Sequence, residues 1–185
     1  MAEAPTAQWT AADLERLSAQ GWRVELWKGR LIRMAPTGDM HGRTTWRLGR
    51  VVDRYIEERH LGQLWPAEAG FDLTRPGETE QTVLAPDIAF VRAERVPPPV
   101  EGFAHVVPDL VVEIASPTQY RPEMDGKARQ WLERGVSLVW AAWPTRRWID
   151  EWRQGDTAPR VLRVGAALEG YDIVPGFRAP VADLF

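Results

Sequence analysis

The sequence contains no cysteine and no asparagine, and its only lysines are Lys28 and Lys127. The lack of cysteine excludes disulfide bonds, thiol chemistry and zinc sites built from cysteine. No apolar run reaches the length of about 18 residues that a membrane-spanning helix needs. The opening stretch, Met1 to Trp9, lacks the basic start and apolar core of a signal peptide. We therefore expect a cytoplasmic protein with no membrane partner.

The charge balance is mildly acidic, with a formal net charge of -3 over 185 residues. This balance argues against avid non-specific binding to nucleic acid, which normally needs a basic surface. It does not exclude an enzyme that meets a phosphodiester through metal ions. The absence of cysteine and asparagine fits a thermostable protein or a GC-rich genome, and the preference for arginine over lysine favours the genome explanation. A lysine retained near carboxylates under such a bias indicates a functional role.

The hydrophobic pattern predicts one mixed α/β domain spanning residues 1–185. Its length suits one domain, and 44% hydrophobic residues with 10 tryptophans suffice for a substantial core. The 3.6-residue periodicity predicts helices over residues 10–20, 41–60 and 124–134, with Trp46 in the apolar stripe of the second. Strands are predicted over residues 24–27, 30–34, 64–65, 69–73, 83–91, 110–115, 137–142, 148–152 and 160–164.

Two features of this pattern constrain the topology. Pro86 interrupts the strand predicted over 83–91, so it should lie at an edge, a bulge or a bend. The strand, helix and strand between residues 110 and 142 should form a right-handed crossover with parallel strands. The element order predicts a mixed central sheet flanked by helices, with additional β-hairpins.

The candidate chemistry comes from carboxylates in apolar strands. Asp87 follows Pro86, and Glu113 interrupts the apolar run Val-Val-Glu-Ile. A buried unpaired carboxylate is costly, so it must find a cation, bind a metal or shift its pKa. Oxygen ligands suit Mg²⁺ or Mn²⁺, which neutralises phosphate and lowers the pKa of bound water. Lys127, in the following helix, can orient that water or offset charge in the transition state.

These residues resemble a known signature. Pro86-Asp87, Glu113 and Lys127 resemble the motif of the PD-(D/E)XK nuclease superfamily and, more narrowly, the bacterial Uma-type restriction endonuclease family. The superfamily usually places its lysine two residues after the glutamate, where this chain has Ala115. Lys127 fits members whose lysine lies on the next helix. The ordered set of matching segments spans nearly the whole chain: Glu25-Leu26, Gly29-Arg30-Leu31, His41, Pro86-Asp87-Ile88, 108–114, Ser116-Pro117, Asp125, Lys127, Gly135-Val136 and Pro175-Gly176-Phe177.

The resemblance implies a restriction-endonuclease-like fold and a Mg²⁺-dependent deoxyribonuclease that hydrolyses DNA by direct attack of water. Asp87 and Glu113 would bind the metal, with the Ile114 carbonyl as a further ligand. Lys127 would assist the nucleophile. Glu25, on the first hairpin, is expected in the same catalytic cleft.

Two residues complete the candidate site. Glu25 could bind a second metal or hold its water, and His41, at the positive end of the long helix, could contact a phosphate oxygen. The alternatives are structural. Asp87 could end a strand, Glu25 could face solvent and His41 could be an ordinary helix N-terminal histidine. Lys127 could be solvated or pair with Asp125, which itself could position Lys127 or, more in keeping with its place, cap the helix.

Three other functions compete with the nuclease. One is a non-catalytic nucleic-acid-binding or protein-binding member of the fold, favoured by the acidic balance and the lack of an obvious basic stripe. Another is hydrolysis of a small phosphodiester, and a third is a structural dimer with a vestigial site. A homodimer is expected, because the Trp-rich strands suggest more apolar surface than one core hides and nucleases that cut duplexes often pair two sites.

Overall fold

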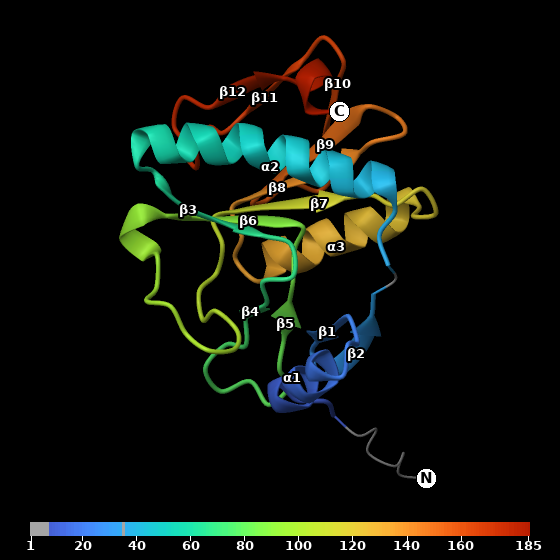
Figure 1. The fold of residues 1–185 in the computed structure, drawn as a ribbon, viewed down its shortest axis with the longest axis vertical. Helices are drawn as coiled ribbons and strands as arrows, with labels where there is room; N and C mark the ends of the chain where they lie inside the picture. Colours follow the sequence, from blue (N-terminus) through green and yellow to red (C-terminus); the bar gives the residue numbers. More distant parts are fainter. Residues whose placement is uncertain (1–7, 35) are drawn as a thin grey trace. The chain divides into compact units, whose positions relative to one another are not determined.

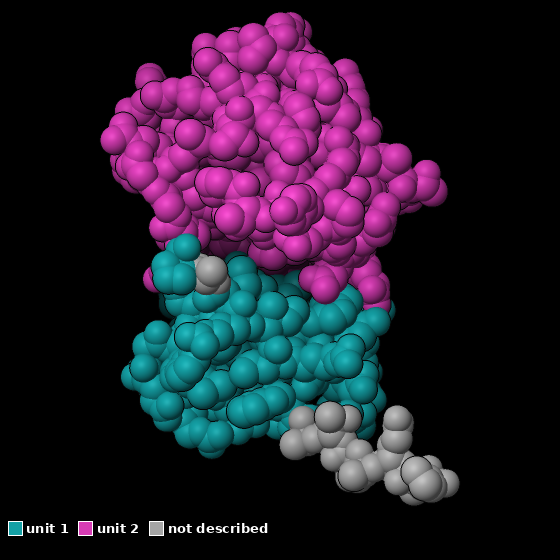
Figure 2. Space-filling view, turned by 90° about the vertical axis from the view of Figure 1, so that its right-hand side faces the viewer, with its two compact units in different colours: residues 1–36, 69–85, 97–106 teal, residues 37–68, 86–96, 107–185 magenta. Residues whose placement is uncertain are grey.

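The computed structural model describes residues 8–34 and 36–185. Residues 1–7, which open the stretch where we predicted no signal peptide, lie outside the described residues. The chain forms two compact units, coloured separately in Figure 2. Unit 1 comprises Met1–Pro36, Ala69–Ala85 and Pro97–Val106, and unit 2 comprises Thr37–Glu68, Pro86–Val96 and Val107–Phe185. The single domain over residues 1–185 stays a prediction.

Unit 1 is a small antiparallel sheet with one helix. The strand order is β2-β1-β5-β4, with bounds β1 Val24–Trp27, β2 Arg30–Arg33, β4 Phe71–Asp72 and β5 Val83–Leu84. Helix α1, Ala11–Ala19, begins with a capping box between Thr10 and Asp13, which satisfies two free backbone N–H groups. Its buried Leu14 packs in a cluster with Leu26 and Val83. The predicted first helix and first hairpin are confirmed.

Unit 2 contains a six-stranded sheet in the order β10-β9-β8-β7-β6-β3. Strands β7 and β8 are parallel, as predicted for the crossover through α3, and all the other pairs are antiparallel. The bounds are α2 Asp39–Arg59, β3 Gly62–Pro66, β6 Ile88–Arg92, β7 Leu110–Ile114, α3 Arg121–Glu133, β8 Leu138–Trp143, β9 Trp148–Arg153, β10 Arg160–Arg163, β11 Ala167–Glu169 and β12 Arg178–Pro180, with 3-10 helices at Ala93–Arg95 and Val181–Leu184.

The two long helices of unit 2 cover opposite faces of its sheet (Figure 1). Alternate residues of a strand point to opposite faces. On β7, Leu110, Val112 and Ile114 pack in one cluster with Leu48 and neighbouring residues of α2. The intervening Glu113 faces α3, whose side chains it contacts. Strand β7 is therefore buried on both faces, which explains its continuous apolar sequence.

Pro86 separates two strands of different sheets. Strand β5 ends at Leu84 in the sheet of unit 1, and β6 begins at Ile88 in the sheet of unit 2. The bend predicted from Pro86 is confirmed, whereas a continuous strand over 83–91 is not. Proline lacks the N–H that a continuous ladder would use, so the chain changes sheets at this point.

Two local predictions are wrong. Helix α3 begins at Arg121 rather than near residue 124, so Asp125 lies inside the helix and does not cap it. Pro122 in the first turn and Glu123, which bonds back to the cap residue, set the earlier start. Trp46 does not join the apolar stripe of α2, because its side chain is 71% exposed. It lies two residues before the buried Leu48, on the opposite side of the helix.

The tryptophans divide between the core and the surface. Trp131, Trp140 and Trp152 are among the largest fully buried side chains, while Trp9, Trp22 and Trp46 are exposed. The buried rings weaken the argument that the apolar strands require a second subunit, so the homodimer stays a prediction. Over residues 8–34 and 36–185, none of the helices has both the length and the apolar character needed to cross a membrane.

Candidate active site

Asp87 lies at the point where the chain enters the sheet of unit 2. The Ile114 N–H donates a hydrogen bond to Asp87 Oδ2 at 2.7 Å, and His41 Nε2 on α2 lies 3.1 Å from the same oxygen. The side chains of Asp87 and His41 are only 14% and 8% exposed. Asp87 is therefore held from two sides, by the end of β7 and by the first turn of α2, and it is not a free turn residue.

Glu113 is buried at 4% exposure, as deeply as Glu25. Its carboxylate accepts a hydrogen bond from Trp131 Nε1 at 2.8 Å on one oxygen and from Lys127 Nζ at 3.1 Å on the other. Lys127 and Trp131 are four residues apart on α3, so they lie on one face of the helix above Glu113. The buried carboxylate is thus paired with a cation and fully hydrogen-bonded, as its cost of burial demands.

The strand register brings the two carboxyl residues together. Strands β6 and β7 are antiparallel and pair Ile88 with Val112. One further step on each strand sets Asp87 opposite Glu113. The predicted Asp, Glu, Lys and His residues therefore gather at one end of the β6–β7 pair. Lys127 contacts Glu113, so it is neither a solvated helix residue nor a partner of Asp125. Their catalytic roles stay predictions.

Glu25 belongs to unit 1. Its carboxylate accepts a hydrogen bond from the Ala85 N–H at 3.0 Å, and it is buried rather than facing solvent. The backbone N–H of Ala85 is two residues before Asp87 in the chain. The role of Glu25 in a site with Asp87 stays a prediction, because the two residues belong to different units.

Two residues near Glu113 were missed by sequence reasoning. Trp131 has the pattern of an ordinary core residue, and nothing in the sequence shows that its indole binds Glu113. Asp150 lies on the same row of the sheet as Glu113, because the register pairs Glu113 with Ala141 and Ala141 with Asp150. A carboxylate in an apolar strand, the pattern that identified Glu113, could also have identified Asp150.

Asp150 is almost completely buried, at 1% exposure. Burial raises its pKa above the ordinary value, and the nearby Arg121 guanidinium offsets only part of that effect. Arg121 Nη2 and Trp143 Nε1 lie 3.1 and 2.8 Å from its two oxygens. The α3 face of the sheet therefore carries a second paired carboxylate beside the first.

Asp87, Glu113 and the Ile114 carbonyl are the candidate ligands for a hard cation. No group of three or more His, Asp or Glu side chains that could hold a metal occurs in the part of the chain that the structure describes. Mg²⁺ commonly uses only one or two carboxylates and keeps several waters. Asp87 Oδ1 makes no hydrogen bond among the described residues, and Glu113 Oε2 faces the flexible Lys127 ammonium. A magnesium site built from these two oxygens, the Ile114 carbonyl and water stays a prediction.

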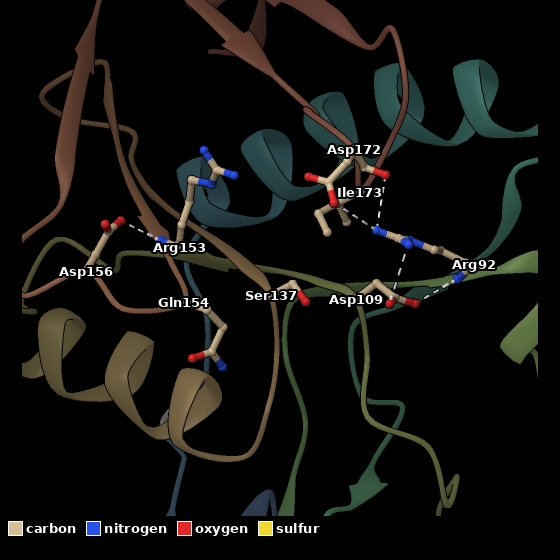
Figure 3. A pocket seen from close by; sticks show the side chains of 8 residues that line it. All are labelled: Arg92, Asp109, Ser137, Arg153, Gln154, Asp156, Asp172 and Ile173. Atoms are coloured by element: carbon tan, nitrogen blue, oxygen red, sulfur yellow. Dashed lines mark hydrogen bonds and ion pairs between the residues drawn. The ribbon is translucent and has the colours of Figure 1, made fainter.

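A separate pocket of about 510 Å³ lies at the other end of the β6–β7 pair. There Asp109 accepts hydrogen bonds from the Arg92 N–H and the Arg95 guanidinium, and Arg92 also lies 3.5 Å from Asp172 (Figure 3). These guanidiniums are already neutralised, and the pocket contains none of the candidate residues. Its lining residues are Arg92, Asp109, Ser137, Arg153, Gln154, Asp156, Asp172 and Ile173.

The mixed sheet between two helices, with these strand-end carboxylates, defines a protein of the restriction-endonuclease-like fold class. The chain belongs to the Uma2 family, whose model is described as "Putative restriction endonuclease" and matches residues 11–182. A crystal structure from Anabaena variabilis, described as "a putative nuclease belonging to DUF820", shares the fold with a TM-score of 0.78. The two chains are 17% identical, and the match covers 95% of this chain and 97% of that one. No curated protein matches the chain. The predicted family and fold class are confirmed.

Proposed function

We propose that the protein is a Mg²⁺- or Mn²⁺-dependent deoxyribonuclease that hydrolyses phosphodiester bonds in DNA. The observation that carries the proposal is the buried pair of Lys127 and Glu113, 3.1 Å apart, beside an Asp87 carboxylate anchored on the Ile114 N–H. A structural ion pair needs only one carboxylate for one lysine. A second carboxylate opposite the first in the strand register, with an oxygen that makes no hydrogen bond among the described residues, supports a divalent-cation site. Family membership supports the same reaction class.

Each residue has a defined task in this proposal. Asp87 and Glu113, with the Ile114 carbonyl, would hold the cation, which supplies charge neutralisation and a more acidic water when bound. Lys127, released from Glu113, would orient the attacking water and offset the charge that develops on the phosphate. Trp131 would hold Glu113 Oε1 in place while Oε2 binds the cation. The leaving 3′ or 5′ oxygen takes a proton from solvent.

His41 is better placed as a positioning residue than as a direct phosphate contact. Its Nε2 lies 3.1 Å from the Asp87 carboxylate, and its side chain is only 8% exposed. It would hold Asp87 in the rotamer that leaves Oδ1 open. The phosphate contact of His41 and the second-metal role of Glu25 are not used in this proposal and stay separate predictions.

The test is a cleavage assay on supercoiled plasmid and on labelled oligonucleotides, with Mg²⁺, Mn²⁺ or EDTA. We expect cleavage only with metal, and a loss of at least 100-fold, about 2.7 kcal/mol in the barrier, for Asp87→Asn, Glu113→Gln and Lys127→Met. Asp109→Asn is the matched control, because Asp109 is a buried carboxylate at the other end of the same strand. Full cleavage by Glu113→Gln with metal would exclude Glu113 as a ligand.

A second candidate is a binding module that has lost catalysis. It is favoured because both oxygens of Glu113 already have protein partners. In that case DNA would bind with equal affinity with or without metal and would not be cut. A homodimer in the cytoplasm remains part of the main proposal, because symmetric cutting of a duplex uses two sites.

A further inference from the structure

Helix α2 carries an exposed arginine stripe on the side away from the sheet. Arg43, Arg47, Arg50 and Arg54 recur at intervals of four, three and four residues, so they share one face. All four are exposed, and the side chains of Arg43 and Arg54 are each 80% exposed. The opposite face of α2 is buried against the sheet. The stripe is about 16 Å long at the helical rise.

The stripe is locally positive in an acidic chain. The segment 39–54 contains four arginines and two aspartates, whereas the whole chain has a formal net charge of -3. Arg43 pairs with Asp39 at 2.9 Å and Arg54 with Glu58 at 2.8 Å, so the ends of the stripe are partly neutralised. Between them, Arg47 contacts only the carbonyl of Phe185, and Arg50 makes no hydrogen bond or ion pair among the described residues. The unneutralised charge is therefore at the centre.

Trp46 lies at that centre. It is three residues from Arg43 and four from Arg50, and its side chain is 71% exposed. Tryptophan is highly buried on average, so a Trp46 that is 71% exposed beside unneutralised arginines is a candidate contact for a partner. Aromatic rings surrounded by cations are the features that bind single-stranded nucleic acid: the ring stacks on a base and the cations follow the phosphates.

We propose that the outer face of α2, built by Arg43, Trp46, Arg47 and Arg50, binds a single nucleic-acid strand. Trp46 stacks on an unpaired base, and Arg47 and Arg50 contact neighbouring phosphates. The identity of the partner as a nucleic acid rests on the proposed function. The same helix carries His41, about 7.5 Å along the axis from Trp46 but on its buried face, so the stripe and the Asp87 site lie on different sides of α2. The partner is single-stranded because bases inside a duplex are stacked on their neighbours and offer no free face to an indole.

The experiment measures binding apart from cleavage. Fluorescence anisotropy in EDTA follows a labelled 20-nucleotide single strand and a hairpin duplex of the same sequence, with the full chain. Trp46→Ala should weaken binding of the single strand by about tenfold or more, as the loss of one stacked base does. Arg47→Gln with Arg50→Gln should weaken it about as much and should make the slope of log affinity against log salt about 1.4 smaller, at about 0.7 per phosphate.

Matched controls remove the same groups elsewhere. Trp22→Ala removes another exposed indole, and Arg163→Gln with Arg178→Gln removes two exposed arginines of unit 2. These variants should bind within twofold of the wild type. Circular dichroism and light scattering on all variants check the fold and the mass of the particle.

The outcomes separate this inference from the proposed nuclease. Binding that depends on Trp46 and the two arginines without any cleavage supports the inference and rejects the nuclease. Cleavage with unchanged binding in these variants rejects the inference and leaves the nuclease standing. The inference is also overturned if the control variants lose as much affinity for the single strand as Trp46→Ala does. It is overturned as well by tight duplex binding that Trp46→Ala does not change. A third contrary result is a protein that binds no nucleic acid and that Trp46→Ala converts from dimer to monomer.

Discussion

Removing the Lys127 ammonium should destabilise the fold through Glu113. Lys127→Met keeps the length and the apolar stem of the side chain but leaves Glu113 without its cation. Glu113 is 4% exposed, so water cannot replace the lost partner, although the Trp131 hydrogen bond remains. The variant therefore isolates the cost of a buried carboxylate that has lost its charge partner.

The size of the effect follows from burial. Breaking a fully buried ion pair by removing one partner costs about 3 to 5 kcal/mol. The Lys127 side chain is 21% exposed, so part of the pair is reached by solvent, and we expect about 2 to 3 kcal/mol. For a chain of this size, such a loss lowers the melting temperature by about 4 to 12 °C.

The assay is thermal and urea unfolding at pH 7 in EDTA, which removes any effect of bound cation. Lys28→Met is the matched control, because Lys28 is the other lysine of the chain and its ammonium lies 5.1 Å from the centre of the Trp27 ring. Its loss should cost less than about 1 kcal/mol. The double variant Lys127→Met with Glu113→Gln should recover most of the lost stability. A Lys127→Met protein within 0.5 kcal/mol of the wild type, a difference of about twofold in the unfolding constant, would refute the reasoning.

Further predictions concern other sites. Burial raises the pKa of the Glu151 carboxyl above its ordinary 4.5, so the folded state binds the carboxyl proton more tightly than the unfolded state does. The stability that protonated Glu151 contributes is therefore lost as pH rises from about 4.5 upward. Relative to the wild type, Glu151→Gln should therefore become more stable between pH 4.5 and 8 by thermal unfolding, whereas the exposed Glu169→Gln should show no such trend. Gly126→Ala, in open space within α3, should stabilise the fold by about 1 kcal/mol. Gly62→Ala should destabilise it by more than that in urea unfolding, because the new Cβ would collide with the Val91 carbonyl and φ is 153°. Equal effects of the two alanines would contradict this.

The sequence was most informative where one local rule decided the structure. The periodicity of 41–60 and the strand, helix and strand between 110 and 142 needed only repeat patterns and lengths, and both were confirmed. The carboxylate in β7 was recognisable because an apolar strand has no reason to carry one. By contrast, the start of α3 depended on Pro122 and on a tyrosine as the cap residue. Because aspartate is a preferred cap residue, the sequence favoured Asp125 and a later start.

Features that depend on distant pairing were not predictable in this way. Leu26 pairs with Val83, and nothing near either residue indicates the other. The Trp131 hydrogen bond to Glu113 likewise requires the crossing of α3 over β7 to be known. The arginine stripe of α2 is a different case, because the spacing of its arginines was already present in the sequence. The net acidic composition of the chain drew attention away from them, and they form one positive face only when the segment is helical.

The alternation of the two units along the chain has a consequence for the order of synthesis. The polypeptide crosses between the units at five points, after residues 36, 68, 85, 96 and 106. Strand β1 emerges early from the ribosome, but its partner β5 follows only after α2 and β3 of unit 2 have been made. Until then the first hairpin has an unpaired edge, which invites pairing with other chains. A nascent chain stalled before residue 83 should therefore be a client for chaperones, while one extended past β5 can close that edge itself.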